Sequence, residues 1–192
     1  MGFAASWVAV SGRTLDQVAE ELGLVLTGKT EEGPKSPISG ATLPNGWALI
    51  FAHEFGSRLV TEKTLQSLSN SGTVVSCQVE EHTMFSSSSC HSNGHEVWNV
   101  CHDAQQHMKH LSTRGSLPES FSVVRDELLR QQEAAGGEAA DVDYVFDIPV
   151  ALAESLTSFR HDQDIGVPQA APFHVLSSTI SSQPNNPWWK VW

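Results

Sequence analysis

Strand-like segments and short amphipathic helices follow one another irregularly along this chain, without a strict strand-helix-strand rhythm. Ala5 to Val10 and Trp47 to His53 are apolar and β-leaning. Between them, Thr14 and Gln17 form a capping box ahead of apolar residues at helical spacing. A regular alternation of strands and helices favours a parallel sheet, whereas this irregular order favours antiparallel pairing. The sequence therefore predicts an α+β fold, with three to four short helices packed on a mainly antiparallel sheet.

A long hairpin is expected in the middle of the chain. Val74 to Phe85 and Glu96 to His102 are strand-like, and the turn-forming pair Asn93-Gly94 lies between them. The run Ser86 to Ser89 is expected to widen the connecting loop. His107 to Ser112 is read as one further strand.

Three more helices and several loops complete the expected domain. Thr61 caps one helix, Leu117-Pro118-Glu119 opens the longest helix, and Pro149 begins the last one. Lys29 to Gly40 reads as a polar loop, and Tyr144 to Phe146 as a short strand. We expect one α+β domain over 1–162, followed by a flexible or partner-docked tail over 163–192, where Pro, Ser, Gln and Asn dominate.

The charge of the chain narrows the possible partners. Eleven Lys and Arg face 22 Asp and Glu, which gives a formal net charge of -11 at pH 7. Such a field repels phosphate backbones and anionic lipid headgroups, so nucleic acid and membranes are excluded as expected partners, and a basic protein is favoured. The alternative is that the acidic residues only keep the protein in solution.

The sequence suggests that the protein is located in the cytoplasm. The opening residues have no basic region of the kind that starts a signal peptide. The apolar runs are far shorter than the roughly 18 residues that cross a bilayer. Three cysteines form an odd, sparse set that is unlike a secreted disulfide framework.

Histidines and cysteines are concentrated between positions 77 and 110, where they could hold zinc or serve a hydrolase. No Cys-x-x-Cys pair is present, and His107-x-x-His110 and His91-x-x-x-His95 have no partner motif. No metal, cofactor or catalytic residue is therefore assigned. The residues in question are Cys77, His82, Cys90, His91, His95, Cys101, His102, His107 and His110.

The familiar catalytic signatures are missing from the chain. It has no Gly-x-Ser-x-Gly elbow, no His-Glu-x-x-His helix and no Gly-x-Gly-x-x-Gly loop. Cys90 beside His91 is the most plausible nucleophile, but a serine-rich loop would hold it poorly. A non-enzymatic protein is the favoured interpretation.

Two groups of residues are candidates for partner binding. Acidic residues recur near the expected strand ends and loops, where they could steer a basic protein into place. Three tryptophans stand in an otherwise polar C-terminal segment and need an apolar surface, either on this chain or on a partner. The candidate binding residues are Glu54, Glu80, Glu81, Asp103, Asp141, Asp143, Asp147, Trp188, Trp189 and Trp192.

Three stretches resemble blocks in an uncharacterised family of small bacterial α+β proteins: Gly2 to Trp7, Val97 to Asp103 and Val142 to Pro149. They span most of Gly2 to Asp162. The resemblance implies a bacterial origin and one continuous domain, and it carries no catalytic motif. More loosely, the chain is similar to the acidic immunity proteins of bacterial toxin systems, including type VI and contact-dependent systems.

These observations lead to three hypotheses. The first is an immunity protein that neutralises a cognate bacterial toxin by covering its active site with an acidic surface. The second is a metal-dependent hydrolase built on the His- and Cys-rich hairpin. The third is an assembly subunit anchored by the tryptophan-containing tail.

Overall fold

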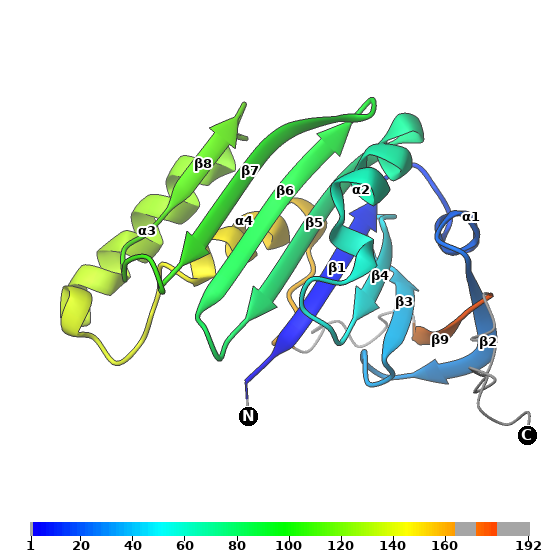
Figure 1. Ribbon diagram of the computed structural model, residues 1–192, viewed down its shortest axis with the longest axis horizontal. Helices are drawn as coiled ribbons and strands as arrows, with labels where there is room; N and C mark the ends of the chain where they lie inside the picture. Colours follow the sequence, from blue (N-terminus) through cyan, green and yellow to red (C-terminus); the bar gives the residue numbers. More distant parts are fainter. Residues whose placement is uncertain (1, 164–171, 180–192) are drawn as a thin grey trace, which may run out of the picture.

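Nine strands form a single sheet in the computed structural model, which describes residues 2–163 and 172–179 (Figure 1). Their bounds are β1 Ala4–Val10, β2 Leu24–Glu31, β3 Ile38–Thr42, β4 Ala48–Ala52, β5 Thr73–Glu80, β6 Phe85–Ser92, β7 His95–Asp103, β8 Ser112–Gly115 and β9 Phe173–Ser178. The order across the sheet is β2-β9-β3-β4-β1-β5-β6-β7-β8, and every neighbouring pair is antiparallel. The expected antiparallel α+β class is confirmed.

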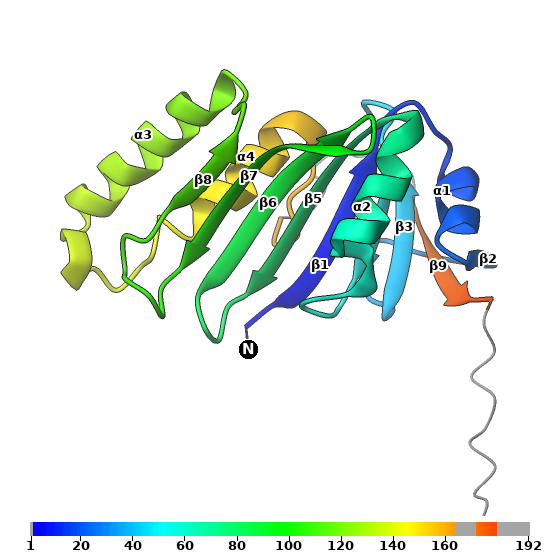
Figure 2. The same ribbon diagram turned by 45° about the horizontal axis from the view of Figure 1, so that its top comes forward.

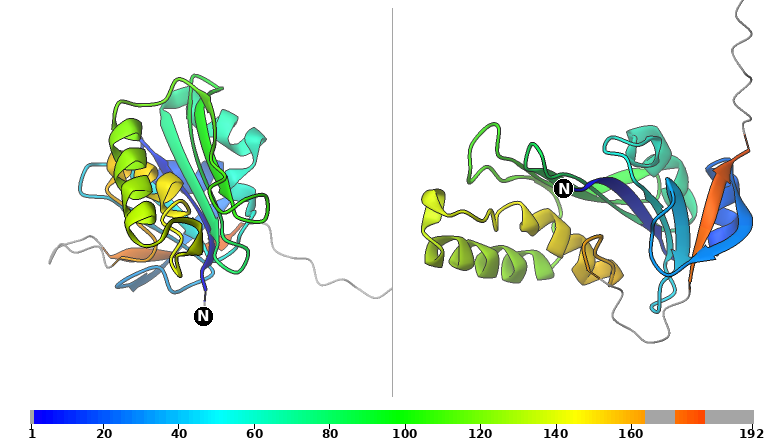
Figure 3. Two further views of the ribbon diagram at one scale, coloured as in Figure 1. Left: turned by 90° about the vertical axis from the view of Figure 1, so that its left-hand side faces the viewer. Right: turned by 90° about the horizontal axis from the view of Figure 1, so that it is seen from below.

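Four α-helices in the described ranges cover the two faces of the sheet: α1 Leu15–Glu21, α2 Glu62–Leu68, α3 Ser120–Ala134 and α4 Asp147–Thr157. Figures 2 and 3 show α1 and α2 on one face and α3 and α4 on the other. Helix α4 lies against β5, β6 and β7, and α3 packs beside α4. Within the described residues, no helix combines the length and the apolar character needed to span a bilayer.

The face toward α4 holds the larger apolar core. Because successive strand residues point to opposite faces, Trp7 of β1, Phe51 of β4 and Cys77 of β5 all face this side. Phe159, just after α4, joins the core with ring centroids 5.3 Å from Trp7 and 6.3 Å from Phe173 of β9. These contacts connect the end of α4 to β1 and β9.

The opposite face is apolar over one half of the sheet and polar over the other. Val8 and Val10 of β1 pack with residues of α1 and α2 in a second core. From β5 to β7 this face is polar, and we call it the open polar face. It carries Ser76, Gln78, Ser87, Ser89, His91 and Asn99.

The hairpin differs from the expected one in its strand bounds. Ser86 to Ser89 were expected in a loop, but they form the centre of β6, which pairs with β5 and β7. Asn93 and Gly94 make the turn between β6 and β7, and both have positive φ angles. Three of the four hydroxyls have partners, since Ser86 Oγ donates to the Phe146 carbonyl at 2.6 Å, Ser87 Oγ accepts from Gln78, and Ser89 Oγ lies 2.8 Å from Ser76 Oγ. The buried Ser88 Oγ has none. The paired hydroxyls of Ser86, Ser87 and Ser89 help to make this serine-rich strand tolerable in the interior.

Three other local expectations were wrong. Tyr144 to Phe146 is not a strand, because the Asp143 carboxylate accepts the backbone N–H groups of Val145 and Phe146 and holds a turn that leads into α4. Within the expected loop Lys29 to Gly40, β2 continues to Glu31 and β3 begins at Ile38. The last hairpin strand, β8, lies at Ser112–Gly115 instead of His107 to Ser112.

The expected boundary after residue 162 also needs correction. Residues 173–178 form β9, which lies between β2 and β3 in the sheet. Phe173 is fully buried there, so this part of the expected tail belongs to the domain. Trp188, Trp189 and Trp192 lie outside the described residues.

Candidate functional site

Acidic residues gather at one end of the sheet, the end where the N-terminus lies in Figure 1. Strands β4, β5 and β7 run in the same direction, because each is separated from the next by one antiparallel strand. Their C-terminal ends are therefore at the same end of the sheet. Glu54 follows β4, Glu80 and Glu81 mark the end of β5, and Asp103 ends β7.

Local hydrogen bonds keep two of these carboxylates ionised. The bond from His82 to the Glu80 carboxylate, at 2.8 Å, lowers the pKa of Glu80. The side chain of Gln106 donates to Asp103, and this bond lowers the pKa of Asp103 against a small opposing effect of burial. Both groups are thus anionic near neutral pH.

An open depression of about 560 Å³ lies at this acidic end. We call it the acidic depression, and its carboxylates are Glu81, Asp141, Asp143, Asp147 and Asp162. Segments far apart in the sequence meet here, since Glu81 follows β5 and Asp141 and Asp143 lie in the turn before α4. Four of the predicted binding residues, Glu81, Asp141, Asp143 and Asp147, are therefore brought together, while Glu54, Glu80 and Asp103 lie outside this depression.

Arg160 is the basic partner within the acidic depression. Its guanidinium lies 2.6 Å from Asp147 and 2.7 Å from Asp162. Burial alone would lower the pKa of Arg160, but the hydrogen bonds and charges of Asp162 and Asp147 raise it. Glu81 is engaged by the backbone N–H of Phe3, and Asp141 is exposed. Five carboxylates and one guanidinium leave the depression strongly negative.

His102 and Asp143 form a buried pair that resembles part of a catalytic triad. Nε2 of His102 lies 3.0 Å from the Asp143 carboxylate, and Nδ1 lies 2.7 Å from the carbonyl of His110. His102 is completely buried and both of its ring nitrogens are engaged, so it has no nitrogen free for a substrate. Burial raises the pKa of Asp143, but the bond and charge of His102 and two backbone N–H groups lower it further than burial raises it. The pair fixes the turn before α4 to β7.

The His- and Cys-rich hairpin does not collect its residues in one place. Cys77 and Cys90 face the core beneath α4, while His91 faces the open polar face. Burial raises the pKa of Cys77 to about 12 and that of Cys90 to about 11, which makes both thiols poor nucleophiles at neutral pH. His82 and His95 are exposed, and exposed His107 lies 3.7 Å from Glu138.

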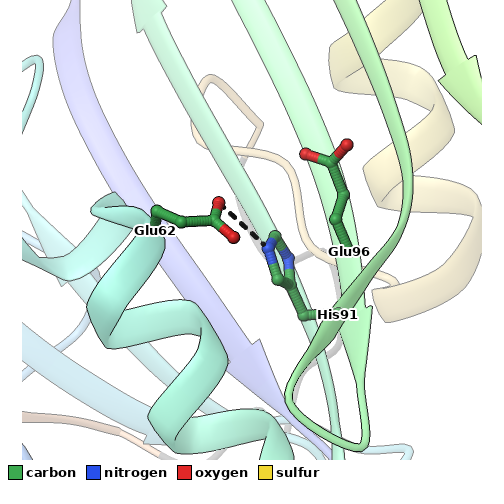
Figure 4. Close-up of side chains that lie close together, drawn as sticks. All are labelled: Glu62, His91 and Glu96. Carbon is green, nitrogen blue, oxygen red and sulfur yellow. Dashed lines mark ion pairs between the residues drawn. The ribbon is translucent and has the colours of Figure 1, made fainter.

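One group of possible metal ligands does converge among the described residues. Glu62 of α2, His91 of β6 and Glu96 of β7 each offer an atom within 4.8 Å of the others (Figure 4). They line a narrow pocket of about 160 Å³ on the open polar face, between α2 and the sheet. His91 was among the sequence candidates, whereas Glu62 and Glu96 were missed. Nothing in the sequence indicates that α2 lies beside the β6–β7 hairpin, and Glu96 comes opposite His91 only through the register of that hairpin.

Comparison with protein families, with curated proteins and with solved structures finds no match for this chain. The resemblance to a bacterial family and to immunity proteins therefore stays a prediction. The functional argument depends on the geometry of the chain itself.

Proposed function

We propose that this chain is a non-enzymatic binding protein whose acidic depression receives a basic segment of a protein partner. The observation that carries the proposal is the gathering of Glu81, Asp141, Asp143, Asp147 and Asp162 around one open depression. A negative concave surface steers a basic partner electrostatically and raises its association rate. The net charge of -11 adds a long-range field of the same sign.

Binding is favoured over catalysis by the state of the reactive groups. The His102–Asp143 pair is buried and saturated, and the thiols of Cys77 and Cys90 have raised pKa values. Neither the His102–Asp143 pair nor the two thiols therefore provide an activated nucleophile.

The specific form that we propose is an immunity protein. An acidic surface can cover the basic active site or substrate channel of a toxin that acts on an anionic substrate, and the resulting complex is specific because the charges are complementary. The partner would be the cognate toxin, and the complex would form in the cytoplasm of the producing bacterium.

Coexpression with the product of a neighbouring toxin gene tests this proposal. We expect the wild-type chain to restore growth, and the double variant Asp141→Asn, Asp162→Asn to protect less well because it removes two charges from the depression. The matched control is Asp16→Asn, Glu20→Gln, which removes two exposed charges from α1. No protection by the wild type, or equal loss in the control, would contradict the proposal.

A metal-dependent hydrolase is the second candidate, because Glu62, His91 and Glu96 meet in a pocket. Its test is hydrolysis of p-nitrophenyl esters with and without Zn²⁺. Turnover that depends on Zn²⁺ and disappears in Glu62→Gln would favour this candidate over the binding protein.

An assembly subunit held by Trp188, Trp189 and Trp192 is the third candidate. A chain that stops after Thr179 keeps β9 and lacks these residues. An unchanged oligomeric state in size-exclusion chromatography would remove the support for this role.

A further inference from the structure

We infer that Glu62, His91 and Glu96 form a binding site for a divalent transition-metal ion, with Zn²⁺ as the representative ion. The site lies on the open polar face and shares no residue with the acidic depression. Ion binding here requires none of the three candidate functions.

The histidine provides the main evidence. The His91 side chain is 1% exposed, and its Nε2 atom has no hydrogen-bond partner. This atom lies 3.5 Å from Oε2 of Glu62, an ion-pair distance that does not meet the geometry of a hydrogen bond. A buried ring nitrogen without a partner is costly, and a metal ion would satisfy it.

The second ring nitrogen has a contact that is compatible with the tautomer that a metal requires. Nδ1 of His91 lies 3.5 Å from Oγ of Ser89, which in turn lies 2.8 Å from Oγ of Ser76. A proton on Nδ1 that points toward Ser89 leaves the lone pair of Nε2 directed into the pocket. Metal-binding histidines are commonly oriented by such a bond from their other nitrogen.

The spacing of the three groups suits an ion after small side-chain movements. Two atoms that are each about 2.1 Å from a tetrahedral ion lie roughly 3.4 Å apart, close to the 3.5 Å between His91 and Glu62. All three ligand atoms lie within 4.8 Å of one another, so a carboxylate needs to move inward by no more than roughly 1.4 Å to reach this spacing. The Glu62 side chain is 60% exposed, and the hydrogen bond that its Oε1 accepts from Gln66 at 2.6 Å lies at the surface, where it can shift with the carboxylate.

The charge and chemistry of the site select the class of ion. One imidazole and two carboxylates suit Zn²⁺ and its first-row neighbours, whereas Ca²⁺ and Mg²⁺ prefer oxygen ligands alone. Arg114 is the competing cation, since its guanidinium lies 3.3 Å from Glu96. Its side chain is 70% exposed, and an exposed ion pair of this kind is weak enough for an ion to displace. A bound ion would connect α2 to β6 and β7.

The test is titration of the full chain, freed of metal with a chelator, with Zn²⁺ alone in a calorimeter. We expect one ion per chain, and an affinity at least about tenfold weaker in Glu62→Gln and in Glu96→Gln. Both substitutions are at positions that are not fully buried, so folding should survive. The matched control is Glu80→Gln, which alters the exposed His82–Glu80 pair at 2.8 Å and should bind Zn²⁺ like the wild type.

Visible spectra with Co²⁺ provide an independent measurement of ligation. We expect absorption bands of a four-coordinate ion in the wild type and in Glu80→Gln, and their loss in Glu62→Gln. Absence of Zn²⁺ binding by the wild type would overturn the inference. Unchanged affinity in both Glu62→Gln and Glu96→Gln would also overturn it, because the ion would then be bound elsewhere.

Discussion

A few buried ionisable side chains have a measurable effect on the stability of this protein. The clearest example is Asp143, which accepts two backbone N–H bonds and pairs with fully buried His102. The sequence indicated Asp143 only as a surface acid. Its structural role could not be predicted, because the partner histidine is 41 residues away and comes near only when the sheet has formed.

We expect Asp143→Ala to destabilise the protein by about 3–5 kcal/mol, because it leaves Nε2 of the buried His102 and two backbone N–H groups without partners. Urea unfolding would measure the change in the free energy of unfolding. The control is Asp126→Ala, which removes a largely exposed carboxylate that pairs with Arg125. A loss in Asp143→Ala no larger than that in the control would show that the pair does not support the fold.

His161 makes the stability depend on pH. It is 8% exposed, and neither ring nitrogen has a hydrogen-bond partner. Burial lowers its pKa below the ordinary value of 6.5, although the nearby carboxylates of Asp162, Glu81 and Asp147 oppose the shift and Arg160 adds to it. The folded state therefore takes up this proton less readily than the unfolded chain. Its contribution to stability is complete above pH 6.5 and declines as the pH falls from there toward the folded pKa.

We expect His161→Phe to weaken this pH dependence, because phenylalanine fills the site and its ring can keep the edge contact that His161 makes with Phe3. The free energy of unfolding would be measured in urea at about pH 7.5 and about pH 5.5. The variant should lose less stability between the two values than the wild type or the exposed control His95→Phe. An equal loss in all three proteins would contradict the assignment.

At the scale of elements, the sequence predicted most of the helices and the strands of the apolar core. The capping box of α1 forms between Thr14 and Gln17, and Thr61 caps α2. These signals are local, so they could be read directly. Short apolar runs likewise indicated β1 and β4.

The elements that the sequence missed depend on distant partners. Ser86 to Ser89 have the composition of a loop, and they become a strand only because β5 and β7 lie on either side of them. Phe173–Ser178 follows a polar segment and pairs with β2 and β3, more than a hundred residues earlier in the chain. Pairing across such distances leaves little local pattern.

The position of β9 leads to a test by truncation. A chain that stops after Gln163 removes the strand between β2 and β3, which then expose unpaired edges, and it also removes Phe173 from its place beside Phe159. We expect it to be at least about 3 kcal/mol less stable in urea than a chain that stops after Thr179. Equal stability of the two truncated chains would show that β9 does not contribute to the fold.

At the scale of the whole molecule, the fold brings together acidic residues that are scattered along the sequence. The antiparallel order places Glu54, Glu80, Glu81 and Asp103 at one end of the sheet, and the turn before α4 adds Asp141 and Asp143 there. Acidic strand ends could be read from the sequence. Their meeting with the turn before α4 could not, because it depends on the path of α3. The cluster of Glu62, His91 and Glu96 has the same kind of origin, since the start of α2, the end of β6 and the start of β7 bring it together.

The binding of a hexalysine peptide, followed residue by residue in amide NMR spectra of the isotope-labelled chain, tests the central claim most directly. We predict shifts concentrated at Glu81, Asp141, Asp147 and Asp162, little change along α1, and weaker binding as salt is added. Shifts spread evenly over all acidic residues, or centred on another surface, would contradict the account.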